Sequence, residues 1–561
     1  MFYDIALYTS LVVFAVGLIY RTSNWFRWKI GPYAAGISTS ARISAAAKAI
    51  ISTVFSAKIA TLLKVFVLDV LLQLWLMKKD FLRWLAHILI YGGFMLLLLM
   101  HGLDTLVTEV LFDDYYSTLN PFMFLRDAFG LMIILGLGIA LYRRVISKPP
   151  RPKSTGADYY AIVILAVIMI SGFLLEGAKI LSQSRYEEMV EEYAGLGEDE
   201  TEELKALEAY WIQGFGVASP DVKGPFDAKT LDEGRELHEM SCASCHSPPQ
   251  WAFIGYPVSR VVRPMATLLD QANVHTMLWY LHFLACFLGL AYLPFSKFFH
   301  IFSTPLYLLV DGVMEEAESD PANIVTKMAM QLDACTHCGD CTVRCSVAVA
   351  FNEIPNPNIL PSEKLAALRS LLSGKKLSEH RLATIQEGSH ICTDCHRCTD
   401  TCPIGINLED LWSQLNSRLT ELGFPKPEAW AREAMGTRYD LAKLREKTLS
   451  LTPMDKGFQK DLTSSAQSST FSVCFGCQTC TNVCPVVANY ENPKEIVGLL
   501  PHEIMHSLAL KQRELALGSN MLWDCVTCYM CQEHCPQQVC VTDVLYQLKN
   551  LGLKQLKGMA A

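Results

Sequence analysis

The sequence has no excess of positive charge and none of the common nucleotide-binding loops. Its 48 lysines and arginines are outnumbered by 56 aspartates and glutamates, which gives a net charge of −8. Nothing in this balance points to nucleic acid as a partner. No G-x-G-x-x-G segment follows a predicted strand, and there is no Walker A loop. A flavin, nicotinamide or substrate site would therefore have to come from another chain.

A basic leader and a small-residue cleavage site are also lacking at residues 5–20, so we expect no cleavable signal peptide. The composition is instead rich in apolar residues, at 51% hydrophobic, while 19% of the residues are charged. This mixture, within 561 residues, indicates a membrane half joined to a soluble half.

The apolar residues are grouped into runs that can cross a bilayer. Five such runs lie at 4–20, 84–103, 124–142, 159–180 and 274–296. A further apolar stretch at 58–77 is interrupted by Lys58, Lys64 and Asp69. We expect it to form an amphipathic helix at the membrane interface, and a sixth span is the alternative.

The charges that flank the five runs are distributed unequally. Basic residues follow the first run, precede the second and follow the third, and acidic residues occupy the opposite loops. By the positive-inside rule the N-terminus and the 181–273 loop are outside, and everything after about 300 is cytoplasmic. The charges are Arg21, Arg27, Lys29, Arg42, Lys48, Lys78, Lys79, Arg83, Arg143, Arg144, Lys148, Arg151 and Lys153 against Asp104, Glu109, Asp113, Asp114 and the acidic run at 187–203.

Five histidines lie in or at the ends of the apolar segments: His87, His101, His275, His282 and His300. His87 and His101 are close to four helical turns apart, and His282 and His300 are five turns apart. Because the second and fifth spans run in opposite directions, His101 should face His282 at one depth and His87 should face His300 at another. Two facing pairs are what two b-type haems require. The alternative is helix packing or interfacial placement, which we favour only for His275.

The residues around these histidines resemble a known family. The segment 294–305, Pro-Phe-Ser-Lys-Phe-Phe-His-Ile-Phe-Ser-Thr-Pro, is similar to the last span of the NarI-like cytochrome b family, and 68–73 and 83–87 resemble the approach to its first haem-ligand span. That family includes the nitrate reductase gamma subunit and the membrane subunits of heterodisulfide reductase and Dsr-type complexes. The resemblance, over roughly 1–305, implies a five-span, quinol-oxidising subunit with one or two haems. The loop between spans four and five is far longer here.

This long loop contains Cys242-Ala-Ser-Cys245-His246, the spacing of a c-type haem attachment site. The thioethers would form at Cys242 and Cys245, with His246 as the proximal ligand. The preceding segment, 234–240, is similar to the start of a small class I cytochrome c, and the loop lies on the expected exoplasmic side. The alternative is a structural cysteine pair or a disulfide.

The sixth ligand of this predicted haem c is less well defined by the sequence. Met265 is the first choice because of its distance downstream of His246. His238 and His275 are the other candidates, and a five-coordinate site is also possible.

Sixteen of the 20 cysteines form four runs with one spacing, C-x2-C-x2-C-x3-C. In this bacterial ferredoxin pattern three cysteines hold one [4Fe–4S] cluster and the fourth reaches the partner cluster. Paired zinc sites are the alternative, but their spacing differs. Proline follows the last three runs, whereas Ser346 follows the first. The runs are Cys335, Cys338, Cys341 and Cys345; Cys392, Cys395, Cys398 and Cys402; Cys474, Cys477, Cys480 and Cys484; and Cys525, Cys528, Cys531 and Cys535.

The four runs form an internal repeat of two modules. The segment 471–550 closely resembles the HdrC component of heterodisulfide reductase, a helical dicluster ferredoxin, and 332–420 is a more distant copy. The resemblance implies that both modules pass electrons to a catalytic partner. The Cys-Cys-Gly pair of the heterodisulfide reductase catalytic subunit does not occur, so we assign no catalytic residue to this chain.

We therefore predict a mainly α protein with a five-helix transmembrane haem bundle, a small exoplasmic cytochrome c insertion and two helical dicluster [4Fe–4S] ferredoxin domains. The predicted parts are the bundle at 1–180 and 274–305, the insertion at 181–273, the first module at 306–420, a linker at 421–470 and the second module at 471–561.

The predicted function is that of the electron-transfer or quinol-oxidoreductase subunit of a membrane-bound respiratory complex. The expected cofactors are four [4Fe–4S] clusters, two haems b, one haem c and menaquinone. The expected partners are the quinone pool and a cytoplasmic heterodisulfide reductase-like or flavin-containing subunit. The alternative is a quinone-independent wire from an exoplasmic cytochrome to a cytoplasmic enzyme. A non-redox scaffold or a cluster-based sensor is a third class that we do not favour.

Overall fold

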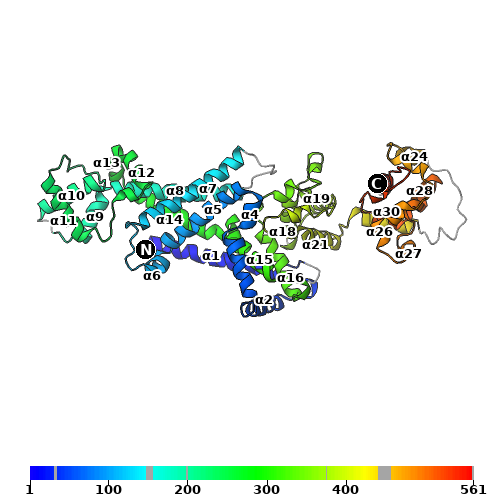
Figure 1. The fold of residues 1–561 in the computed structure, drawn as a ribbon, viewed down its shortest axis with the longest axis horizontal. Helices are drawn as coiled ribbons and strands as arrows, with labels where there is room; N and C mark the ends of the chain where they lie inside the picture. The colour runs from blue at the N-terminus through cyan, green and yellow to red at the C-terminus, as the bar shows by residue number, and fades with distance from the viewer. Residues whose placement is uncertain (31–33, 147–155, 197–199, 374–375, 440–455, 559–561) are drawn as a thin grey trace. The chain divides into compact units, whose positions relative to one another are not determined.

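The structure is a computed structural model that describes every residue except 31–33, 147–155, 197–199, 374–375, 440–455 and 559–561. The predicted basic residues Lys148, Arg151 and Lys153 and part of the acidic run at 187–203 lie outside the described residues. Within the described residues the elements are helices, and none is a strand (Figure 1). This confirms the predicted mainly α class.

Five helical segments of the described chain are long and apolar enough to cross a membrane, which confirms the predicted number of spans. Two of them end in a short segment of different helical type, η3 (Leu98–Gly102) after α5 and η7 (Leu293–Phe295) after α14. The helices are α1 (Phe2–Arg27), α5 (Phe81–Leu97), α7 (Phe122–Val145), α8 (Gly156–Leu181) and α14 (Val274–Tyr292).

The apolar stretch at 58–77 is divided into short pieces, none long enough to cross a bilayer. They are α3 (Lys58–Val65), the π-helical η2 (Phe66–Leu71) and α4 (Leu74–Lys79). Gln73, between the last two, has a left-handed backbone with φ of 52°. The stretch therefore turns instead of continuing as one span.

Close backbone contact joins α5 to α7 in the bundle. A Cβ atom on Gly136 of α7 would lie 2.8 Å from the carbonyl oxygen of Ala86, one residue before His87. Since real Cβ atoms do not come so near, only glycine permits this approach. We call the two ends of the bundle the His87 end and the His101 end, after the histidines near the start and finish of the second span.

The described residues of the insertion at 181–273 form several helices that share a small core. Its α10 crosses α11 at Gly234, where a Cβ atom would lie 2.1 Å from the carbonyl oxygen of Ala206. The core between them contains Leu207, Trp211 and Cys242. The helices are α9 (Gln183–Tyr193), α10 (Thr201–Gly214), α11 (Ala228–Ser241), α12 (Gly255–Val262) and α13 (Ala266–Gln271).

The chain divides into two compact units. The first unit comprises Met1–Lys376 and Asp394–Gln414, so it joins the bundle, the insertion and most of the first cysteine module. Its helices after the fifth span are α15 (His300–Val313), α16 (Pro321–Ala334), α17 (Asp340–Val343), α18 (Pro361–Leu372) and α20 (Arg397–Asp400), followed by α21 (Leu408–Glu421), which continues into the second unit.

The second unit comprises Leu377–Thr393 and Leu415–Ala561. Its helices are α19 (Glu379–His390), α22 (Pro427–Arg438), α24 (Lys456–Leu462), α25 (Thr479–Asn482), α26 (Pro485–Ala488), α27 (Pro493–Val497), α28 (Pro501–Ala509), α29 (Arg513–Gly518), α30 (Asn520–Asp524), α31 (Met530–Glu533) and α32 (Val541–Lys557).

Part of the predicted linker at 421–470 belongs to the core of this second unit. Met435 of α22 and Leu462 of α24 are fully buried in the same cluster as Ile504 and Leu548. The apolar residues of these two helices pack in the same core as the cysteine module.

Candidate functional site

All four cysteine runs adopt the same local backbone. In each run the residues immediately before and after the second cysteine have positive φ, and six of these eight residues are not glycine. Such conformations cost roughly 1 kcal/mol or more each, and they persist where a functional loop requires them. The residues are His337 and Gly339, Asp394 and His396, Gly476 and Gln478, and Thr527 and Tyr529.

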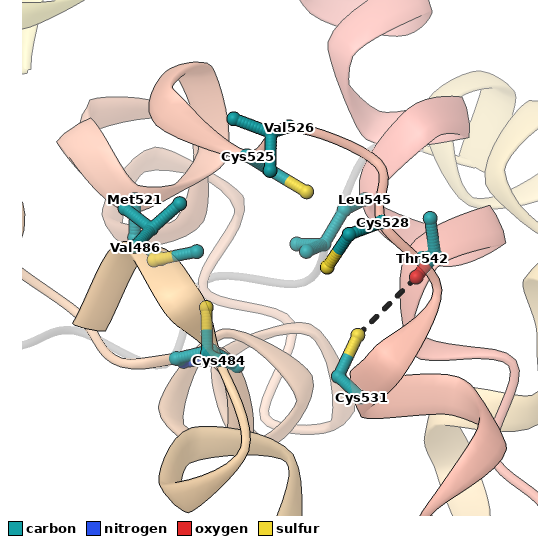
Figure 2. A pocket seen from close by; sticks show the side chains of 10 residues that line it. Cys484, Val486, Met521, Cys525, Val526, Cys528, Cys531, Thr542 and Leu545 are labelled. Carbon is teal, nitrogen blue, oxygen red and sulfur yellow. Dashed lines mark hydrogen bonds between the residues drawn. The ribbon is translucent and has the colours of Figure 1, made fainter. Parts of the chain in front are cut away.

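The fourth run shows how the cysteines of a module combine. Figure 2 shows Cys525, Cys528 and Cys531 with their sulfur atoms directed toward one space, and Cys484 of the third run completes the set from the other side. The Thr542 hydroxyl lies 3.2 Å from Cys531 Sγ. Three thiols from one run and one from its partner are the ligand set of a dicluster ferredoxin.

The same crossed arrangement recurs at the other runs. Cys535 lies within electrostatic reach of Cys474, and Cys480 is close to Cys474 and Cys477. Burial raises the pKa of the Cys480 thiol to about 12 and that of Cys531 to about 11. These thiols therefore need a strong Lewis acid, such as iron, to ionise at neutral pH.

In the first module, Cys402 joins the set of Cys335, Cys338 and Cys341, which we call the first cysteine cradle. Cys345 and Cys395 are correspondingly close to Cys398. Ser346, which replaces the usual proline, lies with its hydroxyl 3.1 Å from Cys395 Sγ. Cys392, the remaining member, belongs to the second unit.

The first cysteine cradle lies against the His87 end of the bundle. Arg83, one turn before His87, forms an ion pair of 2.5 Å with Asp340, which lies between Cys338 and Cys341. The Arg83 guanidinium is also close enough to Cys338 to hydrogen-bond its sulfur. The Trp75 indole N–H and the Lys79 ammonium donate to the Cys402 carbonyl oxygen at 3.3 and 3.5 Å.

Further hydrogen bonds join α1 and α15 to the end of α16, just before the first cysteine of the cradle. The Asp333 carboxylate accepts from Arg21 at 2.6 Å and from the Trp25 indole N–H at 2.8 Å. The Thr304 hydroxyl, four residues after His300, donates at 3.0 Å to the Ala334 carbonyl oxygen, next to Cys335. Buried, partly charged contacts of this kind hold the cradle in one position.

The predicted histidine pairs are brought together. The ring centroids of His87 and His300 are 6.0 Å apart. His101 is near enough to His282 for a charge on one ring to affect the other. The His87 and His300 rings are close enough that they could hold one haem iron between them.

The ring nitrogen atoms of these histidines differ in their hydrogen bonds. His300 Nδ1 donates to the Lys297 carbonyl oxygen at 2.6 Å, and His282 Nδ1 lies 3.1 Å from both the Ile168 carbonyl oxygen and the Ser171 hydroxyl. With the proton on Nδ1, Nε2 carries the lone pair that could bind a metal; the Cys286 sulfur lies 4.0 Å from His282 Nε2. Among the described residues, the buried Nδ1 atoms of His87 and His101 have no hydrogen-bond partner.

One detail of the fifth span differs from the prediction. His282 and His300 do not share a continuous helix, because α14 ends at Tyr292 and Ser296 is extended before His300 begins α15. The Pro294 ring interrupts the helical hydrogen bonds at this point. His300 nevertheless reaches His87, since the chain resumes as a helix at His300 itself.

The Cys242-Ala-Ser-Cys245-His246 segment follows the end of α11. Cys242 is buried in the core of the insertion, and the His246 ring packs edge-on to Trp211 with centroids 5.3 Å apart. Burial and the neighbouring His238 lower the pKa of His246 to about 4, which keeps the ring neutral. A neutral imidazole is the form that binds a metal.

The candidates for the sixth ligand lie in different places. Met265 ends the short η6 (Arg263–Met265) and is 52% exposed. His238 is buried beside Trp211, and its Nδ1 has no partner among the described residues. His275 lies 3.8 Å from Asp270. Met265 stays a prediction as the sixth ligand.

Two residues with prominent positions are not identified as functional by the sequence analysis. Arg83 enters there as a flanking positive charge and as part of the 83–87 resemblance, although its place one turn before His87 could have suggested a role. Asp127 is fully buried in α7, where its carboxylate accepts from the Ile254 and Gly255 amides at 2.6 and 3.2 Å. An acidic residue inside an apolar span is a signal that could have found it.

Comparisons with known proteins agree with these cysteine sites. Residues 331–406 and 470–539 match the model of the 4Fe-4S dicluster domain. The chain is 22% identical over 376 residues to the EtfAB:quinone oxidoreductase of Syntrophomonas wolfei, covering 59% of this chain and 44% of that protein. No solved structure matches the chain.

Two relatives are components of heterodisulfide reductases. The component HdrE of the dihydromethanophenazine:CoB–CoM enzyme of Methanosarcina barkeri is 27% identical over 30% of this chain and 68% of its own length. The component HdrC of the ferredoxin:CoB–CoM enzyme of Methanosarcina mazei is 37% identical over 15% of this chain and 46% of its own length. The matches support an HdrE-like membrane part joined to HdrC-like iron–sulfur modules and agree with electron transfer at a membrane.

Proposed function

We propose that this chain is the electron-transfer subunit of a membrane-bound respiratory complex. It relays electrons between menaquinone and haems b in the bilayer and a cytoplasmic heterodisulfide reductase-like partner through four [4Fe–4S] clusters. The proposed haem b ligands are His87 with His300 and His101 with His282. The proposed haem c ligands are Cys242, Cys245, His246 and Met265.

The observation that carries this proposal is the contact between the first cysteine cradle and the His87 end of the bundle. Arg83 contacts the cradle through Asp340 and lies one helical turn before His87. A haem held by His87 and His300 would therefore be a near neighbour of the first cluster. Electron transfer between two carriers requires this kind of fixed, close placement.

The residues of the chain itself have distinct parts in such a relay. When bound, the haems and clusters supply one-electron carriers, and the protein sets their potentials by ligation, hydrogen bonding and burial. Arg83 and Lys79 place positive charge beside the cradle, which stabilises the more negative, reduced form of a cluster. The ion pair of Arg21 with Asp333 fixes the start of the cysteine module on the bundle.

The names of the relatives support the two ends of the proposed path. One relative is a quinone oxidoreductase, and others are heterodisulfide reductase components. The flanking charges support the proposed sidedness, with the cysteine modules in the cytoplasm and the insertion outside. The chain spans less than half of the quinone oxidoreductase that it matches, so its own substrate and partners remain part of the proposal.

The cofactor content of the purified chain tests the proposal. We expect the iron and sulfide of four [4Fe–4S] clusters, two extractable haems and one haem that stays attached through denaturation. A preparation that supports complex activity but binds no haem would overturn the proposed membrane relay.

The quinone-independent wire remains the second candidate, and one observation favours it. The haem c segment contacts the bundle directly, because the Thr118 hydroxyl donates to the Cys245 carbonyl oxygen at 2.6 Å. An exoplasmic cytochrome could then exchange electrons with the bundle through this segment. In that case changing Cys242 and Cys245 to Ala abolishes haem b reduction by an external donor. Unchanged kinetics would exclude this candidate.

A further inference from the structure

The insertion at 181–273 is connected to the bundle by the chain at both of its ends. It also contacts the His101 end of the bundle at two further points. At the first point the Thr118 hydroxyl donates to the Cys245 carbonyl oxygen at 2.6 Å. The Ser247 amide donates to the Thr118 carbonyl oxygen at 3.1 Å, and the Asn120 amide donates to the Ser247 hydroxyl at 2.9 Å. These bonds hold the residues on both sides of His246 against the loop that precedes α7.

The second point is Asp127, whose side chain is fully buried in α7. Its carboxylate accepts hydrogen bonds from the amides of Ile254 and Gly255, which begin α12 of the insertion. Since the first amides of a helix have no partner within the helix, a carboxylate satisfies them strongly. The bundle thus supplies the N-terminal cap of a helix in the insertion.

Close backbone packing reinforces this second point. A Cβ atom on Gly177 of α8 would lie 3.2 Å from the Gly255 carbonyl oxygen and 3.2 Å from the Ser259 amide nitrogen. The helices α8 and α12 therefore meet almost backbone to backbone. Such an interface leaves little room for the insertion to tilt or lift away.

The loop that contains Thr118 is also hydrogen-bonded to the second span, next to His101. The Tyr115 hydroxyl and the Thr108 hydroxyl both donate at 3.0 Å to the Met100 carbonyl oxygen. Tyr115 is buried and lies three residues before Thr118. One short loop is therefore bonded to the residue next to His101 at one end and to Cys245 at the other.

We propose that the insertion is a fixed electron port, in which haem c is held permanently against the His101 end and exchanges electrons directly with the neighbouring haem b. This proposal rests on the haem assignments of the proposed function. It excludes a tethered head that swings between the bundle and an outside partner. The partner would then deliver or remove electrons at the insertion, while the haem c itself stays in place.

The rate of electron transfer from haem c to haem b in the full-length, detergent-purified protein tests this proposal. A flash-activated ruthenium trisbipyridine complex, a cationic photoreductant suited to the acidic insertion, reduces haem c, and the spectrum reports the arrival of electrons at haem b. For a fixed port the rate stays unchanged as sucrose raises the solvent viscosity. A rate that falls in proportion to viscosity would overturn the proposal.

A matched pair of variants at Asp127 provides the second arm. Asp127→Asn keeps one acceptor oxygen for the α12 amides and should transfer electrons at the native rate. Asp127→Ala removes the acceptor that both α12 amides use, and the transfer rate should fall below that of the native protein and of Asp127→Asn. Equal rates in the native protein and Asp127→Ala, with native haem content, would contradict the assigned fastening.

Hydrogen exchange separates a failure of this inference from a failure of the haem assignments. In the full chain the Ile254 and Gly255 amides should exchange as slowly as those inside α7, whether or not haem is bound. Fast exchange at both amides would refute the fixed insertion. Slow exchange in a protein without covalent haem would instead refute the haem c assignment and, with it, the electron port.

Discussion

Arg83 is the side chain through which the bundle and the first cysteine cradle make their closest charged contact. It pairs with Asp340 and lies beside Cys338. Its own backbone is held by Asp80, which accepts from the Arg83 amide at 3.0 Å and pairs with Arg143 at 2.5 Å. The geometry fixes a positive charge next to one predicted cluster ligand.

We therefore expect Arg83→Gln to lower the reduction potential of the first cluster, because the reduced cluster loses a stabilising cation. The expected change is on the order of 60 mV, about 1.4 kcal/mol for one electron. An electron paramagnetic resonance titration of the membrane-extracted protein measures it. Arg143→Gln is the matched control, since Arg143 contacts Asp80 at the same end of the bundle and should leave the potential unchanged. Equal potentials in all three proteins would show that Arg83 has no influence on the cluster.

Cys484 belongs to the third run by sequence but lies with the cysteines of the fourth (Figure 2). Cys484→Ala should therefore remove or alter the cluster of Cys525, Cys528 and Cys531 and spare the one held by Cys474, Cys477 and Cys480. Iron analysis and the magnetic resonance signals of the two clusters measure the loss.

The matched control for this variant is Cys540→Ala. Cys540 is only partly buried and lies outside the four runs, so its removal should leave the iron content unchanged. If Cys484→Ala lost the cluster of Cys474, Cys477 and Cys480 and kept that of Cys525, Cys528 and Cys531, the crossed arrangement would be contradicted.

At the scale of elements, the bundle presents two histidine pairs from the second and fifth spans. Close packing of α5 on α7 places His87, and the break between α14 and α15 places His300. Each pair contains one histidine whose Nδ1 lies within hydrogen-bond distance of a backbone carbonyl oxygen and one whose Nδ1 has no partner among the described residues. The two pairs are thus equivalent in construction although their local backbones differ.

Removing one histidine of a pair should cost one haem. We expect His87→Ala, and separately His101→Ala, to lower the extractable haem b content by about half. His275→Gln is the control, because His275 lies beside Asp270 and outside both pairs. Pyridine haemochrome spectra measure the content. Full haem b content in both alanine variants would show that these histidines do not bind haem.

Much of this arrangement is predictable from the sequence, for identifiable physical reasons. The five spans follow from apolar length, and the cysteine loops follow from their spacing, since both are local properties of the chain. Helical periodicity predicts the meeting of His87 with His300, yet the helix is broken at Ser296. The contacts of Arg83 and Asp127 could not be predicted, because they join segments more than 120 residues apart.

At the scale of the whole molecule, the two cysteine modules have different surroundings. Most of the first module belongs to the same compact unit as the bundle, and the second module builds a core of its own with helices α22 and α24. The sequence shows two similar modules. The structure shows that the first contacts the His87 end of the bundle, where we propose a haem b.

The proposed path therefore runs from the membrane into the first module and on toward a partner. A chain that carried its clusters only as structural supports would not need the first cradle beside His87. Its clusters would also stay oxidised when the bundle is reduced. After a reductant is added, the order in which the absorption spectra of the haems and the iron–sulfur clusters change distinguishes these two cases.

The most direct measurement is the visible spectrum of the detergent-purified chain, recorded by rapid mixing with a reduced menaquinone analogue. The account predicts fast reduction of b-type haem, blocked by a quinone-site inhibitor, followed by bleaching of the iron–sulfur absorption. If quinol reduces no haem while dithionite or an external cytochrome reduces all of it, the quinone-linked relay is contradicted.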